Sequence, residues 1–262
     1  MKHDGRGARI VYGVLIGLFA AVALVSCWKL GSIFYEYHLG RQEYQSLEQY
    51  VSTPVPVPTA DDTSEDTAAP SEASDFPNVD FVTLATINPD AAAWLCIEDT
   101  AVNYPVVYAP DNDTYLTVSF NGTENASGCL FFDYRVESVA DDVHPVIYGH
   151  HMRDGSMFKT LVSYKEQDFY DEHPTALLLT PGGNYRVAFF SGYVCQSEGS
   201  AWRRSFSDTA SYAAWLEDIC ALSCFESEVV PTETDRVLTL STCSYEYNDA
   251  RFVLHGVLLP EE

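Results

Sequence analysis

Cys243 is the residue of this chain whose surroundings best suit chemistry. It follows a predicted strand over 236–242, and the polar, flexible residues 244–249 come directly after it. A cysteine at the end of a strand and facing a loop is exposed enough to react. A thiol attacks as its thiolate, so a base or a positive charge must lie beside it. The predicted chemistry is nucleophilic attack by sulfur.

Two histidines and one arginine fit the supporting roles. His150 and His151 follow a short predicted strand over 145–148, again at a strand end. Arg251 opens the strand after the Cys243 loop, and in adjacent antiparallel strands the end of one lies beside the beginning of the next. An arginine cannot act as a base in proteins, but it can donate hydrogen bonds to a developing oxyanion. Each residue alone is more typical of a structural position, and the spacing by itself leaves both interpretations open.

Five other cysteines sit in apolar surroundings and are expected to be small buried hydrophobes: Cys96, Cys129, Cys195, Cys220 and Cys224. Cys220 and Cys224 lie one turn apart on a predicted helix. Such a pair could just form a strained disulfide, and the sequence leaves open whether the two cysteines pair. The sequence contains no CxxC pair that would indicate a zinc site.

Charge and composition exclude several classes of protein. The chain has 262 residues, of which 14 are basic and 38 acidic, for a formal net charge of −24. This argues against nucleic acid as a partner, because phosphate binding needs a basic face. With 47% hydrophobic and 20% charged residues, the chain is neither wholly disordered nor a polytopic membrane protein.

The N-terminus has the pattern of a single membrane anchor. Residues 10–28 hold no charge, and as a helix they would span about 28 Å, close to the thickness of the bilayer hydrocarbon. The basic residues within 1–9 predict a cytoplasmic N-terminus and an extracellular remainder. Two alternatives stay open: a lipoprotein signal, with Leu24–Cys27 as a lipobox and Cys27 lipidated, or a cleaved secretory peptide.

The remainder divides into a linker and one domain. Residues 29–76 are predicted to form a juxtamembrane segment, helical to about Tyr50, followed by a stalk over 52–75 rich in Pro, Ser, Thr and acidic residues. Residues 77–262 are predicted to form a compact extracellular domain.

Within this domain, helices are predicted over 157–164 and over 207–224, with Ser207 as the cap of the second. The fold class expected is mostly β: a closed or nearly closed barrel with peripheral helices, preceded by the transmembrane helix. Strands are predicted over 101–107, 128–133, 145–148, 176–180, 185–193, 236–242 and 251–258.

Several motifs resemble the sortases, the transpeptidases that attach proteins to Gram-positive cell walls. The run Thr239–Cys243 followed by Arg251 resembles the TLxTC…R signature of that family. The segment IYGHHM at 147–152 resembles class B sortases in particular. So do the segments 87–97, 104–107, 111–116, 128–133 and 155–161, and the resemblance extends from about residue 81 to the end.

The resemblance implies an eight-stranded sortase-type barrel, to which class B adds a helix that 207–224 fits. It implies that Cys243 is the nucleophile, that His150 is the acid and base, and that Arg251 orients the substrate and stabilises the oxyanion. His150 takes this role because it directly follows the glycine of the motif, which leaves His151 as a structural neighbour. Further candidates for substrate binding are Tyr148, Thr242 and Trp202.

The reaction implied by the resemblance is transpeptidation without a metal or a cofactor. A C-terminal sorting signal similar to NPxTx would be cleaved after Thr through a thioester, and the protein would pass to a peptidoglycan amine. The enzyme would be a single-pass protein of the cell membrane. Two alternatives stay open: a Cys-His hydrolase that uses the same residues with water, and a lipidated wall-binding module anchored through Cys27.

Overall fold

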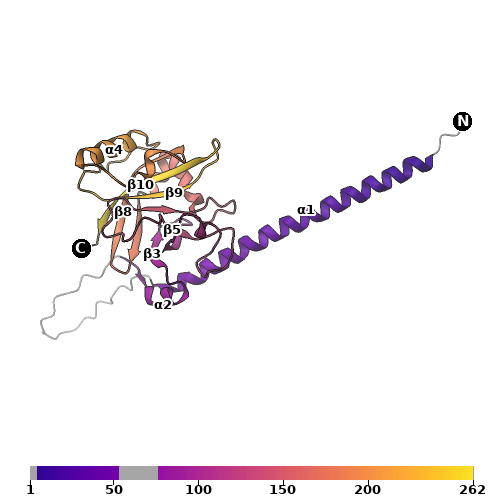
Figure 1. Ribbon diagram of the computed structural model, residues 1–262, viewed down its shortest axis with the longest axis horizontal. Coiled ribbons are helices and arrows are strands. Elements are labelled where there is room, and N and C mark those ends of the chain that lie inside the picture. The colour runs from indigo at the N-terminus through magenta and orange to yellow at the C-terminus, as the bar shows by residue number, and fades with distance from the viewer. Residues whose placement is uncertain (1–4, 53–75, 262) are drawn as a thin grey trace.

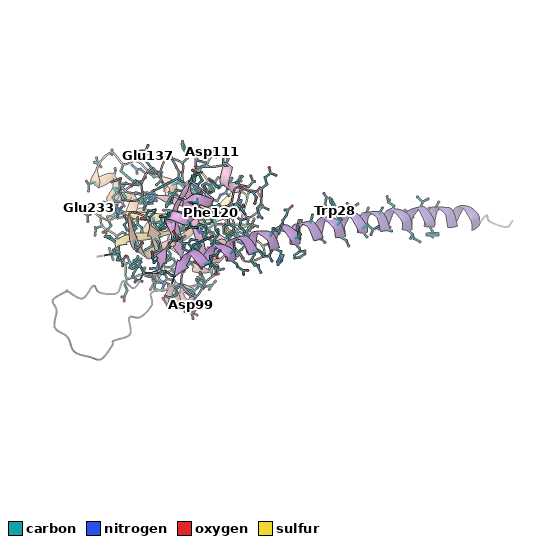
Figure 2. The ribbon with its side chains drawn as sticks, turned by 90° about the horizontal axis from the view of Figure 1, so that it is seen from below. Trp28, Asp99, Asp111, Phe120, Glu137 and Glu233 are labelled. Atoms are coloured by element: carbon teal, nitrogen blue, oxygen red, sulfur yellow. The ribbon has the colours of Figure 1, made fainter. Side chains whose placement is uncertain are left out.

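The computed structural model describes residues 5–52 and 76–261, so the predicted stalk lies almost wholly outside the described residues. Helix α1 (Gly5–Leu47) begins the described chain and leads into the short 3₁₀ helix η1 (Glu48–Tyr50). The predicted continuation of the apolar helix to about Tyr50 is confirmed. From Val11 onward this helix is long and apolar enough to cross a membrane, and an 18-residue stretch of it has a mean hydropathy of 2.2. Most of it stands clear of the remainder (Figure 1), and the exposed Trp28 lies on this free part (Figure 2).

The described residues form a closed barrel of eight strands, as predicted. Around the barrel the order is β10-β8-β7-β3-β4-β5-β6-β9. The pairs β4–β5 and β6–β9 are parallel and the other six are antiparallel. The bounds are β3 (Ala91–Cys96), β4 (Asn103–Tyr108), β5 (Leu130–Phe132), β6 (Val146–Tyr148), β7 (Thr175–Thr180), β8 (Gly183–Gln196), β9 (Val237–Cys243) and β10 (Ala250–Pro260).

Smaller elements surround the barrel. Two short strands, β1 (Val51–Ser52) and β2 (Asn78–Val79), pair with each other beside it. The remaining elements are α2 (Phe81–Ile87), η2 (Thr114–Leu116), η3 (Phe158–Lys165), α3 (Gln167–Glu172), η4 (Ser200–Trp202) and α4 (Thr209–Ala221).

The structure corrects three details of the sequence prediction. Strand β3 is missing from the strands predicted by pattern, because half of its residues are alanines and its centre is buried without alternation. The segment predicted as a helix over 157–164 is the 3₁₀ helix η3. Helix α4 is capped by Asp208 rather than Ser207, since the Asp208 carboxylate accepts the backbone N–H of Ser211 at 2.8 Å.

Strand β10 separates two hydrophobic cores. Its residues Phe252 and Leu254 point into the barrel, whereas Val253 and Val257 pack against helix α4, where Trp215 is buried. Because successive side chains of a strand face opposite sides, an almost continuous apolar run serves both cores. Helix α4 thereby covers the outer face of β8, β9 and β10.

Two buried histidines lie in a hydrogen-bonded chain within the second core. His144 contacts the backbone carbonyl of Arg203 at 2.7 Å and the hydroxyl of Thr239 at 2.6 Å, and Thr239 contacts His255 at 2.7 Å. Burial lowers the pKa of His144 from its usual 6.5 to about 4 and lowers the pKa of His255 well below its usual value. Both rings are therefore neutral in the folded protein at neutral pH.

We expect the free energy of unfolding to fall as the pH drops from about 6.5 towards 4. The unfolded chain binds protons at these histidines below pH 6.5, while the folded chain does not until about pH 4, so acid favours the unfolded state. For His144 alone the loss at pH 5 is about 2 kcal/mol. Urea unfolding at pH 7.5, 6 and 5 measures it, and His144→Asn should flatten the dependence. Equal stability at pH 7.5 and pH 5 would contradict this expectation.

Candidate active site

Strands β6 and β9 bring His150 and Cys243 to the same rim of the barrel. The two strands are parallel neighbours in which Tyr148 lies opposite Ser241. The backbone N–H of Gly149 continues the ladder by donating to the Ser241 carbonyl at 3.1 Å. His150 and Cys243 each lie two residues beyond this pair, so they emerge at the same level. The carboxyl ends of parallel neighbours meet at one edge.

Arg251 joins them through the hairpin between β9 and β10. The two strands are antiparallel, and Arg251 lies directly opposite Cys243. Residues opposite each other in an antiparallel pair project from the same face of the sheet. The sequence prediction that Arg251 sits beside Cys243 is confirmed by this register.

All six residues predicted for the site line one open cavity of about 470 Å³. They are Tyr148, His150, Trp202, Thr242, Cys243 and Arg251. Seven further lining residues are Asn112, Leu116, Phe131, Arg135, Gly149, Ser197 and Ser241. The chain is strongly acidic, but the described residues of this lining include two arginines and no carboxylate. The cavity therefore suits an electron-rich ligand such as a peptide carbonyl.

A backbone carbonyl fixes the orientation of the His150 ring. The Nε2 atom of His150 lies 2.7 Å from the carbonyl oxygen of Leu116 in η2. A carbonyl can only accept, so Nε2 carries a proton and Nδ1 is the ring nitrogen left free to exchange one with a substrate. The preceding Gly149 allows no larger residue, because a Cβ there would lie 2.3 Å from Leu130 and 2.6 Å from Phe158. This tight backbone packing sets the position of His150.

His151 takes a different environment, as its predicted role of structural neighbour requires. Its Nδ1 atom lies 2.9 Å from the backbone carbonyl of Cys243, and its ring packs against that of Tyr245. Burial lowers its pKa below the usual value of 6.5. His151 is not part of the cavity lining. It holds the backbone of Cys243 rather than facing its sulfur.

The other cysteines differ from Cys243 in their surroundings. All seven lie in the described part of the chain and none forms a disulfide, so Cys220 and Cys224 are unpaired. Burial raises the pKa of Cys129 to about 12 and, despite the nearby Arg251, that of Cys195 to about 11, which keeps both as thiols. The prediction that Cys224 is buried is wrong: it lies beyond the end of α4 and is exposed.

A buried carboxylate, Asp133, organises one wall of the cavity. It accepts hydrogen bonds from the Tyr148 hydroxyl at 3.0 Å, from the Asn112 amide at 3.3 Å and from two guanidinium nitrogens of Arg135 at 2.7 and 2.8 Å. Burial alone would raise the pKa of Asp133, but these donors outweigh it and hold the pKa at about 2. Three lining side chains are thus fixed by one ionised group. Asn112 and Arg135 were not predicted, although Asn112 lies in one of the motifs.

Trp202 and Thr242 form another part of the lining. The indole N–H of Trp202 in η4 donates to the Ser241 hydroxyl at 3.2 Å, which holds the loop 197–206 against β9. The Thr242 hydroxyl is buried and has no hydrogen-bond partner among the described residues. A buried unsatisfied hydroxyl beside Cys243 is a position at which a ligand could supply the missing partner.

The described residues contain no group of three or more His, Cys, Asp or Glu side chains that could hold a metal ion. Cys243, His150 and Arg251 provide a thiol, an oriented imidazole and a guanidinium at one cavity. Such a set can carry out acyl transfer through sulfur.

Comparison with known proteins shows consistent similarity to one family, although no family model matches the sequence. Sortase B of Listeria monocytogenes is 35% identical over 178 residues, which cover 67% of this chain and 72% of that protein. The solved sortase B of Bacillus anthracis superposes with a TM-score of 0.72 at 28% identity, covering 87% of this chain and 100% of that one. The Staphylococcus aureus sortase B–substrate complex gives a TM-score of 0.66 at 30% identity, covering 70% of this chain and 85% of that one.

Proposed function

The chain belongs to the class B sortase family and is a cysteine transpeptidase. We propose that Cys243, His150 and Arg251 cleave a protein within its C-terminal sorting signal and transfer that protein to an amine of the cell wall. The observation that carries this proposal is the meeting of the three side chains at one cavity, through two strand registers. His150 lies far from Cys243 and Arg251 in the chain, and the pairing of β6 with β9 brings it to the same cavity.

The reaction begins with attack by sulfur. The Cys243 thiol gives its proton to the Nδ1 atom of His150, and the resulting thiolate adds to the carbonyl carbon of a threonine in the signal. The tetrahedral oxyanion accepts hydrogen bonds from Arg251. As the C–N bond breaks, His150 gives a proton to the departing amine and a thioester remains. An incoming amine then attacks the thioester and loses its proton to His150. The new amide leaves and the Cys243 sulfur is free again.

Tyr148, Thr242 and Trp202 are proposed to bind the signal peptide. Trp202 offers an apolar ring beside Ser241, and the Thr242 hydroxyl offers an unsatisfied polar group. Tyr148 is held rigidly by Asp133 and presents its ring to the cavity. An NPxTx-like signal is proposed from the class resemblance. The solved Staphylococcus aureus sortase B–substrate complex shows that a similar protein binds its substrate, which supports a substrate-binding role for this cavity.

We propose that the N-terminal helix anchors the enzyme, with 1–9 in the cytoplasm, 10–28 in the membrane and the domain 77–262 outside. The apolar, exposed character of α1 supports the membrane span, and the basic residues within 1–9 support this orientation. Cys27 lies on the exposed surface of α1. Mass spectrometry of the purified chain tests the lipoprotein alternative, because a diacylglycerol on Cys27 would identify it.

Incubation of the full chain in detergent micelles with a library of signal peptides, with and without triglycine as the amine, tests the proposed reaction. We expect cleavage after threonine in NPxTx-like peptides and an added triglycine on the product. Release of the free acid alone, in the same amount with and without triglycine, would identify a hydrolase and overturn the transferase proposal.

Replacing Arg251 with alanine is expected to lower kcat/KM by about 10²- to 10³-fold, since a donor to the oxyanion is lost. Arg251→Lys should recover only part of the rate, because an ammonium group lacks the planar fork of the guanidinium. Steady-state kinetics with a labelled signal peptide measure both variants. Arg186→Ala, which removes an arginine that packs on Phe76 instead, is the control. A rate for Arg251→Ala equal to that of Arg186→Ala would exclude the proposed role.

A further inference from the structure

The last turns of α1 are docked on the barrel rather than projecting from it. Tyr44 and Leu47 on these turns are 5% and 4% exposed and belong to the main core. Glu43 accepts the backbone N–H of Asn121 at 3.0 Å, and the Tyr44 ring packs edge-on against Tyr104 of β4 at 5.3 Å. The helix that contains the apolar segment is therefore continuous with the packed domain.

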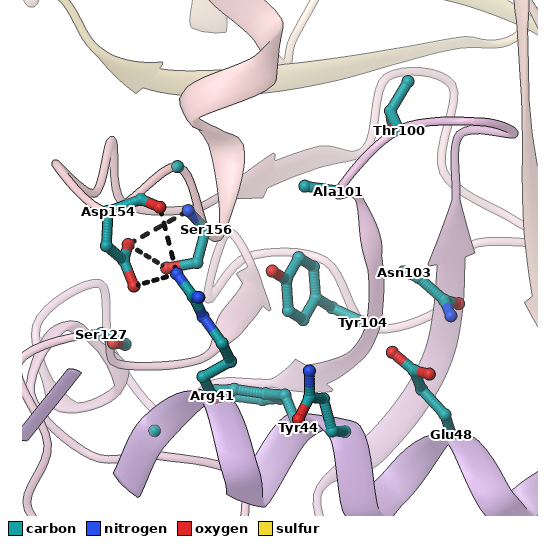
Figure 3. Close-up of a pocket in the computed structure, with 13 residues that line it drawn as sticks. Arg41, Tyr44, Glu48, Thr100, Ala101, Asn103, Tyr104, Ser127, Asp154 and Ser156 are labelled. Atoms are coloured by element: carbon teal, nitrogen blue, oxygen red, sulfur yellow. Dashed lines mark hydrogen bonds and ion pairs between the residues drawn. The ribbon is translucent and has the colours of Figure 1, made fainter. Parts of the chain in front are cut away.

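Arg41 joins the docked turns to the loop that follows the two histidines. Its guanidinium donates to both the backbone carbonyl and the carboxylate of Asp154, each at 3.1 Å (Figure 3). The Asp154 carboxylate also accepts the N–H of Ser156 at 3.1 Å and its hydroxyl at 2.6 Å. A cavity of about 380 Å³ lies beside these groups. Hydrogen bonds from Arg41 tie this stretch of loop to the helix.

The same loop is bonded directly to His150. The backbone N–H of Phe158 donates to the His150 carbonyl at 2.9 Å, and Met157 forms a β-bridge with His151. Met157 has a φ of +55°, a conformation that needs support from its surroundings, and its N–H donates to the Tyr104 hydroxyl at 3.1 Å. A shift of residues 154–156 is thus transmitted to the backbone of His150.

A second connection reaches the His150 ring from the same turns. The Tyr44 hydroxyl donates to the carbonyl of Gly128. Gly128 is packed so closely on residue 116 that an added Cβ would lie 2.8 Å from the Leu116 carbonyl oxygen. That carbonyl accepts the hydrogen bond from His150 Nε2. The helix therefore supports both the backbone and the ring of this histidine.

We propose that the docked turns of α1 position His150 for catalysis, with Arg41 acting through Asp154 as a positioning residue. The inference rests on the proposed role of His150. It assigns the juxtamembrane helix a part in the rate of the reaction as well as in attachment. A loosened loop would leave His150 in the right place for only part of the time, which lowers kcat without changing how the peptide binds.

Arg41→Ala in the full chain, in detergent micelles, tests the proposal. We expect kcat to fall by about fivefold with KM unchanged, since small displacements of a catalytic group cost rate rather than binding. The midpoint of thermal unfolding should stay the same, because the Arg41 side chain is 51% exposed and such pairs contribute little to stability. Arg41→Lys should keep part of the rate, and the exchange of charges in Arg41→Asp with Asp154→Arg should restore more than either single change.

Glu43→Ala is the matched control, since it removes a helix–barrel bond from the same turn without touching the loop 152–157. It should lower kcat by less than Arg41→Ala does, because it leaves the bonds to Asp154 in place. An unchanged kcat in Arg41→Ala would overturn the inference, as would no recovery in the exchanged pair, and an equal loss in Glu43→Ala would overturn the specific role of Arg41. The proposed function fails separately, if the unmodified chain transfers no peptide or if Cys243→Ala retains the activity.

Discussion

Replacement of Cys243 with alanine should abolish both thioester formation and transfer, with kcat reduced by about 10⁴-fold or more. No neighbouring group can replace it as nucleophile: the thiol of Cys195, on the far side of Arg251, has its pKa raised to about 11 by burial. Intact-protein mass spectrometry after mixing with a signal peptide should detect the acyl adduct on the unmodified chain and none on the variant.

Cys195→Ala and Cys224→Ala are the controls for this experiment. Cys195 is the thiol opposite Arg251 on strand β8, and Cys224 is exposed and remote from the cavity lining. Both variants should form the adduct at close to the original rate. Transfer by Cys243→Ala, or its loss in either control, would assign the nucleophile to another residue.

The sequence predicts that the candidate residues lie at the ends of strands. It predicts only in part that these strand ends lie next to one another. The hairpin between β9 and β10 is local, so the sequence suffices to place Arg251 beside Cys243. The pairing of β6 with β9 joins segments almost one hundred residues apart and in parallel, and no short-range pattern encodes it. The placement of His150 beside Cys243 could therefore be predicted only from the resemblance to the sortases.

The supporting network around Asp133 was beyond sequence reasoning for a different reason. Asp133 follows a short strand, and an acidic residue at such a place is usually solvated. Its burial depends on donors from Asn112 and Arg135 in the surrounding loops and from Tyr148 on the neighbouring strand. Only the fold brings these groups together, and each has an ordinary surface interpretation when taken alone.

The sequence of the last turns of α1 contains a pattern that indicates a buried helix face. Gly40, Tyr44 and Leu47 follow one another at spacings of four and three, so they share one face of the helix. In the structure this face meets the barrel: Gly40 leaves room for Asn125 and Ser127, and the other two residues are buried. The predicted boundary of the domain at residue 77 omits these turns, so experiments on catalysis are better done with the full chain.

Replacement of His150 with alanine should lower kcat by about 10³-fold, because the contribution of general acid–base catalysis is lost. The ring is oriented by the Leu116 carbonyl, which leaves Nδ1 free to exchange a proton with the amine that leaves and the amine that enters. Added imidazole should restore part of the rate of His150→Ala, because the variant leaves a ring-sized space in an open cavity. Single-turnover kinetics with and without imidazole measure the recovery.

His151→Gln separates the role of His150 from that of its neighbour. His151 bonds the Cys243 carbonyl and does not line the cavity, so its replacement removes a backbone contact while the proton-transfer group stays in place. We expect the loss of kcat in His151→Gln to be a small fraction of that in His150→Ala. Added imidazole should not change the rate of His151→Gln, since no catalytic proton acceptor is missing. A larger loss in His151→Gln than in His150→Ala, or rescue of the former by imidazole, would move the proton-transfer role to His151. The glycine of the YGHH motif would then position the acid and base two residues along the chain instead of one.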